Sequence, residues 1–173
     1  TFHKLFSIAI DRELKNFVET GTSRGKDKFY YLRPKINWKD GMSTILFAEY
    51  VKLNKGQLWT CDIEAKNIRN ASQFLKDYNL HANLIVSDSL NFLEGFSETI
   101  DVLYLDSHDG NLPGANEHQL REAELSIGKI NSNGLIMLDD KGQKTELSIP
   151  FLISEGWEII FESENQVIFQ KAD

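Results

Sequence analysis

The sequence predicts a doubly wound α/β domain whose seven-stranded sheet is mostly parallel and ends in an antiparallel hairpin. Short apolar runs alternate with longer amphipathic stretches along the chain, which is the pattern of strand–helix–strand units in a parallel sheet. The last two strand candidates are separated only by residues 163–165. So short a connection requires an antiparallel hairpin, because a parallel connection needs a crossover.

The individual elements follow from the same alternation. Strand candidates lie at 16–19, 57–62, 82–87, 100–106, 134–139, 157–162 and 166–171. Helix candidates lie at 44–53, 65–78, 89–96, 117–130 and 145–155, and they supply the crossovers between parallel strands.

One stretch, residues 26–40, does not fit the alternation and is predicted to be an inserted loop between Gly25 and Gly41. Loops of this length in a compact domain are usually functional or mobile. Tyr30, Tyr31 and Trp38 within it would either form a lid over the site or pack the loop onto the core.

Length, charge and cysteine content restrict the class of protein. A chain of 173 residues fits a single domain spanning 1–173. The net charge of -7 disfavours nucleic acid as a partner, and no apolar run approaches the roughly 20 residues needed to span a membrane. Cys61 is the only cysteine, so no internal disulfide can form and a reducing, cytoplasmic location is expected. The start at Thr1 without Met leaves open a place in a longer chain, and a homodimer is also open.

Acidic residues follow the strands in succession. The first strand runs into a turn with sequence Glu19-Thr20-Gly21-Thr22-Ser23-Arg24-Gly25. The next four strands end in Asp62, Asp88, Asp106 and the pair Asp139-Asp140. Because the carboxyl ends of parallel strands meet at one edge of the sheet, these side chains predict a ligand site there. Each is also a potential helix cap, and Asp62 or Glu64 would cap the helix near Ala65.

In this order and spacing, the motifs resemble those of class I S-adenosylmethionine-dependent methyltransferases. The subgroup they resemble is the small-molecule O-methyltransferases related to macrocin and catechol methyltransferases. The resemblance spans roughly Phe17 to Lys171 and implies a Rossmann-like fold with S-adenosylmethionine as cofactor.

The resemblance also implies roles for single residues. Glu19 and Gly21 would border the methionine part of the cofactor, and Asp62 would bind the ribose hydroxyls. Asp88 and Ser89 would flank the adenine, and Asp106 would lie beneath the sulfonium. The remaining cofactor-binding candidates are Thr22, Ser23 and Ile63.

Methyl transfer depends mainly on alignment of the acceptor with an already activated methyl group, and a hydroxyl acceptor must also lose its proton. Asp106 and His108 are the catalytic candidates, with His108 as the base, although a surface histidine without a role is the alternative. Asp106, Asp139 and Asp140 would hold Mg²⁺ or Ca²⁺, which prefer carboxylate oxygens. Alternatively, Asp140 simply starts a turn with the residues that follow.

The function predicted from the sequence is therefore metal-assisted O-methylation of a hydroxylated small molecule, without a nucleic-acid or membrane partner. One alternative is an NAD(P)-dependent oxidoreductase, which the missing third glycine of the dinucleotide fingerprint disfavours. The other is a non-catalytic, nucleoside-binding relative.

Overall fold

A computed structural model describes residues 1–22, 26–27, 35–36 and 42–172 of the chain. The helices are α1 (Phe2–Asp11), α2 (Ser43–Asn54), α3 (Ala65–Asp77), α4 (Ser89–Gly95), α5 (Ala115–Ser126), the short 3₁₀ helix η1 (Ile127–Lys129) and α6 (Ser148–Ser154). The strands are β1 (Asn16–Thr20), β2 (Lys26–Asp27), β3 (Lys35–Ile36), β4 (Gln57–Asp62), β5 (Asn83–Val86), β6 (Ile100–Leu105), β7 (Ile130–Leu138), β8 (Trp157–Glu162) and β9 (Val167–Lys171).

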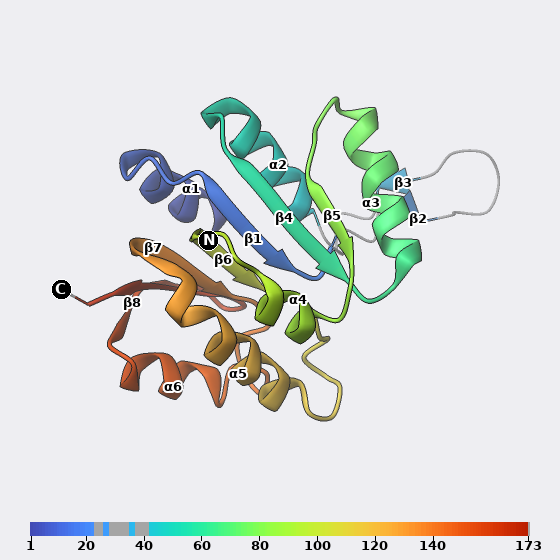
Figure 1. Cartoon of the computed structure of the whole chain (residues 1–173). Coiled ribbons are helices and arrows are strands. Elements are labelled where there is room, and N and C mark those ends of the chain that lie inside the picture. The colour runs from blue at the N-terminus through green and yellow to red at the C-terminus, as the bar shows by residue number, and fades with distance from the viewer. Residues whose placement is uncertain (23–25, 28–34, 37–41, 173) are drawn as a thin grey trace.

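The main sheet has seven strands in the order β5-β4-β1-β6-β7-β9-β8. The first five in this order are parallel, whereas β9 runs antiparallel to both β7 and β8. This confirms the predicted fold class, hairpin included. The chain order reverses at β1, which pairs with β4 on one side and β6 on the other, and Figure 1 shows β1 and β4 running side by side. Ligands of open α/β sheets bind in the crevice at such a reversal.

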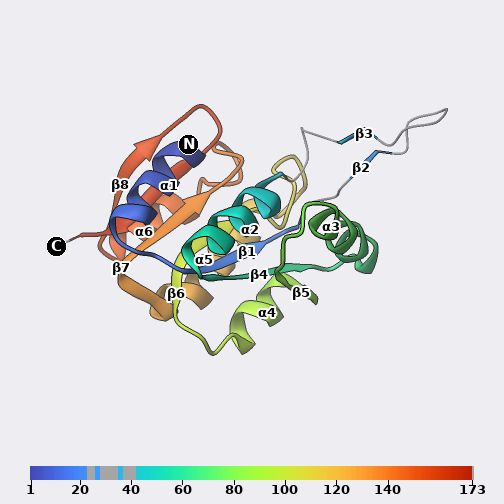
Figure 2. The same ribbon diagram turned by 90° about the horizontal axis from the view of Figure 1, so that it is seen from above.

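Helices cover both faces of this sheet (Figures 1 and 2). Successive residues of a strand point to opposite faces, so Phe17 and Val18 of β1 enter different cores. The first core joins the sheet to α1, α2 and α3 through residues such as Leu5 and Phe47. The second joins it to α4, α5 and α6 through residues such as Leu93 and Leu152. The five-residue strand β1 is therefore buried on both faces, as expected for a parallel sheet.

The main differences from the prediction concern α1, α5 and β7. The helix α1 was not expected, and it packs its apolar side on α2, where the ring of Phe6 stacks on Tyr50 with centroids 5.2 Å apart. The helix predicted at 117–130 ends earlier, at Ser126, and β7 begins at Ile130 instead of 134.

Part of the predicted insertion forms a second, two-stranded antiparallel sheet, in which Lys26 pairs with Ile36. Tyr30, Tyr31 and Trp38, which carried the lid prediction, lie outside the described residues. Among the described helices, none is long and apolar enough to cross a membrane.

Candidate active site

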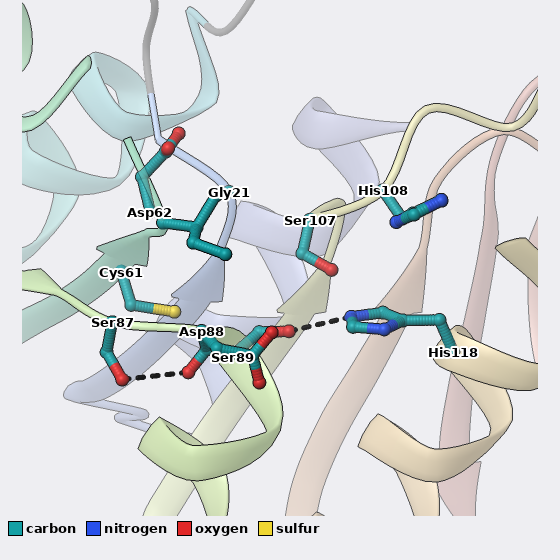
Figure 3. Close-up of a pocket in the computed structure, with 10 residues that line it drawn as sticks. Gly21, Cys61, Asp62, Ser87, Asp88, Ser89, Ser107, His108 and His118 are labelled. Carbon is teal, nitrogen blue, oxygen red and sulfur yellow. Dashed lines mark hydrogen bonds between the residues drawn. The ribbon is translucent and has the colours of Figure 1, made fainter. Parts of the chain in front are cut away.

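A groove lies at the carboxyl ends of β1, β4, β5 and β6. It consists of a cavity of about 480 Å³ and a smaller one of about 100 Å³ that share lining residues such as Gly21, Asp62 and His108. Figure 3 shows the side chains that surround the smaller cavity. The groove brings together most of the sites predicted from the sequence, namely Gly21, Thr22, Asp62, Ile63, Asp88, Ser89, Asp106 and His108. Ser23 lies outside the described residues.

Glu19 does not line the groove but lies buried in β1. Its Oε2 accepts a hydrogen bond from Thr44 Oγ1 at 2.7 Å, while Oε1 has no partner among the described residues. Burial raises the pKa of Glu19 to about 7, against the lowering effect of the hydroxyls of Ser43, Thr44 and Thr60. With Oε1 lacking a partner among the described residues, this carboxyl group could accept a hydrogen bond from a donor that reaches it.

Gly21 has a left-handed backbone with φ +83°. A Cβ at this position would lie 2.4 Å from the backbone oxygen of Asp106, which is too close for any side chain. The backbone following β6 already fills the space that a side chain at this position would need, so the fold itself requires glycine here.

Asp62 lies at the end of β4, on the wall of the groove. Its Oδ1 accepts from Glu64 N at 2.7 Å, and Asn67 Nδ2 donates to both of its oxygens at 3.2 and 3.1 Å. A longer contact of 3.5 Å joins Oδ2 to Thr22 N. Asp62 therefore secures the start of α3 and faces the groove at the same time, whereas the side chain of Glu64 makes no cap.

Asp88 and Ser89 begin α4. Asp88 is the N-cap of this helix and accepts hydrogen bonds from Leu90 N and Asn91 N, so the capping interpretation holds while the residue also lines the groove. Ser89 Oγ lies 2.8 Å from His118 Nε2, as Figure 3 shows.

His118 and Glu122 form a polar cluster on α5 that the sequence analysis missed. Ser107 Oγ donates to Glu122 Oε1 at 2.6 Å, and His118 Nε2 lies 3.7 Å from the same oxygen. Glu122 is fully buried, and its Oε2 has no partner among the residues described. The nearby carboxylate of Glu122 raises the pKa of His118. The rings of His118 and His108 stack with centroids 5.2 Å apart. The spacing of four residues, which places His118 and Glu122 on one side of a helix, was the available sequence signal.

Lys144 occupies the position where the sequence predicted a divalent metal ion. Its Nζ lies 3.2 Å from Asp106 Oδ1 and 3.4 Å from Asp140 Oδ2, and the lysine side chain is 0% exposed. Within the described ranges, no three acidic, histidine or cysteine side chains are grouped so that they could hold a metal ion. The predicted trio of Asp106, Asp139 and Asp140 therefore does not fit a metal, because an ammonium group already lies between two of its members.

Burial raises the pKa of Asp106 well above its usual value, and the neighbouring Asp139 raises it further, while Lys144 opposes both effects. Asp106 lines the larger cavity with a side chain that is 29% exposed. It is thus a carboxylate that can take up a proton from a bound molecule.

Comparisons with known proteins agree with the fold. A family model described as a methyltransferase domain matches residues 38–141. Among solved structures, the SAH-bound methyltransferase PaMTH1 from Podospora anserina superimposes with a TM-score of 0.71 at 15% identity, covering 99% of this chain and 78% of its own. An rRNA methylase from Streptococcus thermophilus gives a TM-score of 0.65 at 15% identity, with 99% and 96% covered. A methyltransferase from Geobacter sulfurreducens gives 0.64 at 18% identity, with 100% and 78% covered. No curated protein matches significantly.

The family match does not favour the oxidoreductase alternative. It extends over more than half of the chain and includes every strand from β4 to β7. The chain belongs to the methyltransferase domain family, and it has the fold of the class I S-adenosylmethionine-dependent methyltransferases.

Proposed function

We propose that the groove binds S-adenosylmethionine and that the chain transfers its methyl group to a hydroxyl of an uncharged small molecule. The observation that carries this proposal is the order of polar groups along the groove. Asp62 and the Asp88–Ser89 turn line the groove at the ends of β4 and β5, and Glu19, whose Oε1 has no partner among the described residues, lies buried in the adjacent strand β1.

Each of these groups matches one part of the cofactor. Glu19 Oε1 would accept a hydrogen bond from the ammonium of the methionine part, and Asp62 would accept from the ribose hydroxyls once Asn67 releases one oxygen. Ile63 is 67% exposed and offers apolar surface to the adenine ring, beside Asp88 and Ser89. Burying an apolar side chain of this size against a ligand stabilises the complex by about 1.5–3 kcal/mol.

The chemistry of the acceptor falls to Asp106 and His108, which line the larger cavity. The hydroxyl oxygen bonds to the methyl carbon while the carbon–sulfur bond breaks and its electron pair stays on sulfur. Asp106 takes the hydroxyl proton, because burial and Asp139 raise its pKa and so favour its protonated form. His108 borders the same cavity and is the second candidate for this proton.

The charge of the site supports an uncharged acceptor. Asp106 and Asp109 line the cavity, and Asp139 and Asp140 follow the adjacent strand. Lys144 pairs with two of these four carboxylates, and the whole chain has a net charge of -7. Such a surface repels phosphate groups, on which binding to nucleic acids depends. The rRNA methylase among the structural neighbours makes RNA the acceptor to test against.

Replacing Asp62 tests the cofactor part of the proposal. The change Asp62→Ala should weaken binding of S-adenosylhomocysteine by more than about tenfold, because a charge-assisted hydrogen bond contributes about 1.5–3 kcal/mol. Isothermal calorimetry measures the affinity, and NAD serves as the competing ligand. Glu64→Ala is the matched control on the same turn and should bind normally. Undiminished affinity of Asp62→Ala, with loss in Glu64→Ala, would show that the assigned carboxylate is the wrong one.

The acceptor is tested separately with S-adenosylmethionine that carries a labelled methyl group. We expect label in uncharged polyhydroxylated or phenolic compounds and none in short RNA oligonucleotides. The change Asp106→Asn should abolish transfer while the affinity for S-adenosylhomocysteine stays within a few-fold. Label in RNA alone would overturn the small-molecule assignment and leave the cofactor site intact.

A further inference from the structure

Lys144 lies in the connection between β7 and α6, and its ammonium group is enclosed by protein. Lysine is almost never fully buried unless it is paired. Here Nζ contacts one carboxylate from the end of β6, Asp106, and one from the end of β7, Asp140. The lysine therefore joins the two strand ends at which the acceptor of the proposed reaction would lie.

The turn that presents Lys144 is fixed on both sides. Asp139 N bonds to Leu105 O at 3.2 Å, which ties the end of β7 to the end of β6. Asp140 Oδ2 also accepts from Gly110 N at 3.1 Å. Further along, Gly142 N donates to the buried Thr145 Oγ1 at 3.0 Å. The ammonium is thus held in place by a constrained turn rather than by a flexible surface side chain.

The charges around Lys144 explain its position. Asp106, Asp139 and Asp140 are neighbouring carboxylates at the end of a buried sheet, and their repulsion would be strong without a positive charge between them. In such a site, a bound Mg²⁺ or Ca²⁺ would be expected to reduce the repulsion between the carboxylates, since Mg²⁺ is usually bound by one or two carboxylates and water. Like such an ion, the Nζ atom of Lys144 lies between two carboxylate groups and contacts one oxygen of each.

We propose that Lys144 is the built-in cation of the acceptor site and takes the place of a divalent metal ion. Lys144 holds Asp106 at the cavity that this residue lines, and it keeps Asp140 from repelling that carboxylate. This inference rests on the proposed function only in so far as it refers to an acceptor. The role of Lys144 as a counter-ion is tested independently of methyl transfer.

The test is thermal unfolding with and without MgCl₂ or CaCl₂. The wild-type melting temperature should not change with either salt beyond the change seen with NaCl of equal ionic strength. In Lys144→Ala, the freed carboxylates should bind the divalent ion. A hundredfold excess over the dissociation constant should then raise the melting temperature by roughly 5–10 °C. Lys144→Arg should behave as the wild type, because it retains the charge.

Two further variants make the result specific. Lys141→Met is the matched control, because Lys141 lies on the same turn but pairs with Glu162 at 3.1 Å. It should show no gain with divalent ions. The double change Lys144→Ala with Asp140→Asn should lose the gain, since one carboxylate is gone. If Lys144→Ala does not fold alone, a cooperative transition should return on refolding with MgCl₂ or CaCl₂.

Two outcomes would overturn the inference. One is a divalent-specific gain in the wild type, which would place a metal ion beside the lysine. The other is the absence of any gain or refolding in Lys144→Ala. Failure of the proposed function has a different signature, because wild-type protein would then fail to bind S-adenosylhomocysteine in calorimetry whatever the salt response. A purely structural role for Lys144 would lower the melting temperature without making it respond to divalent ions.

Discussion

Glu19 is fully buried, and its Oε1 has no partner within the part of the chain that the structure describes. Under the proposed function, its proton would therefore report on cofactor binding. With a pKa of about 7, Glu19 holds a proton in part of the free molecules near neutral pH. A bound ammonium would lower this pKa, so binding should release a proton and affinity should rise with pH through about 7.

Calorimetry in two buffers of different ionisation enthalpy measures that proton. At pH 6.5, the wild type should give binding heats for S-adenosylhomocysteine that depend on the buffer, and Glu19→Gln should not. The exposed Glu64→Gln serves as control. Equal heats in both buffers for the wild type would show that Glu19 does not release a proton when the ligand binds, and would contradict its assigned contact. Without ligand, the raised pKa means that Glu19 costs stability as the pH rises from its usual value of 4.5 through 7.

The polar cluster on α5 gives a second pH dependence of stability, with the same sign as that of Glu19 without ligand. The pKa of His118 is raised by Glu122, so its protonated form stabilises the fold below the unfolded-state pKa of about 6.5. That contribution is lost as the pH rises through the folded-state pKa. Glu122→Gln should lower the pKa of His118, as followed by NMR titration of its ring. Glu117→Gln, on the exposed side of the same helix, should leave it in place. A His118 titration curve that is the same in all three proteins would contradict the assigned cause.

At the scale of single residues, the sequence predicted the groove residues that directly follow a strand. It missed the buried charged residues whose surroundings arise only from tertiary packing. Asp62 and Asp88 could be found because a carboxylate directly after a strand falls on the ligand edge whatever the details. The sequence alone would place Glu122 on the exposed side of a polar helix. Its burial arises only when α5 packs on β6. The sequence alone would assign Lys144 to an exposed loop, because nothing in its neighbours along the chain indicates that Asp106 lies beside it.

Among the elements, α1 is the one whose contribution can be measured directly. Leu5 is 0% exposed in the first core, whereas Ile10 on the same helix is 56% exposed. Leu5→Ala should lower the free energy of unfolding by about 2–5 kcal/mol, the usual loss for a buried leucine. Ile10→Ala should change it by less than about 0.5 kcal/mol. Denaturant titration compares the two. Similar losses would mean that α1 is not anchored through the first core.

The missed elements have different causes. Phe2, Leu5, Phe6 and Ala9 do carry the spacing of an amphipathic helix, so α1 was available from the sequence. The start of β7 was not, because Asn131, Ser132 and Asn133 are poor strand formers, and pairing across the sheet prevails over their preference. The register shift between Ile100 and Val102 lies beside this polar stretch.

Across the whole molecule, two glycines allow stability to be separated from binding. A Cβ on Gly56, at the amino end of β4, would lie 2.2 Å from Lys15 O, and a Cβ on Gly21, at the opposite end of β1, would meet Asp106 O. Either change to Ala overpacks the sheet and should cost roughly 1–3 kcal/mol of stability. Only Gly21→Ala should also weaken binding of S-adenosylhomocysteine by molecules that are folded, because Gly21 lines the groove and Gly56 does not. Calorimetry well below the melting temperature checks this, and equal affinities for the two variants would place Gly21 outside the site.

The position of β9 affects the order in which the sheet can be completed during protein synthesis. The strand lies between β7 and β8, yet it is the last of the three to leave the ribosome. Until residues 167–171 emerge, β7 presents an unpaired edge, and its segment from Leu135 to Leu138, fully buried in the finished fold, lacks the cover of this strand. An open apolar edge is prone to pair with other chains. A nascent chain of this protein therefore needs protection from self-association until its last described strand has been translated.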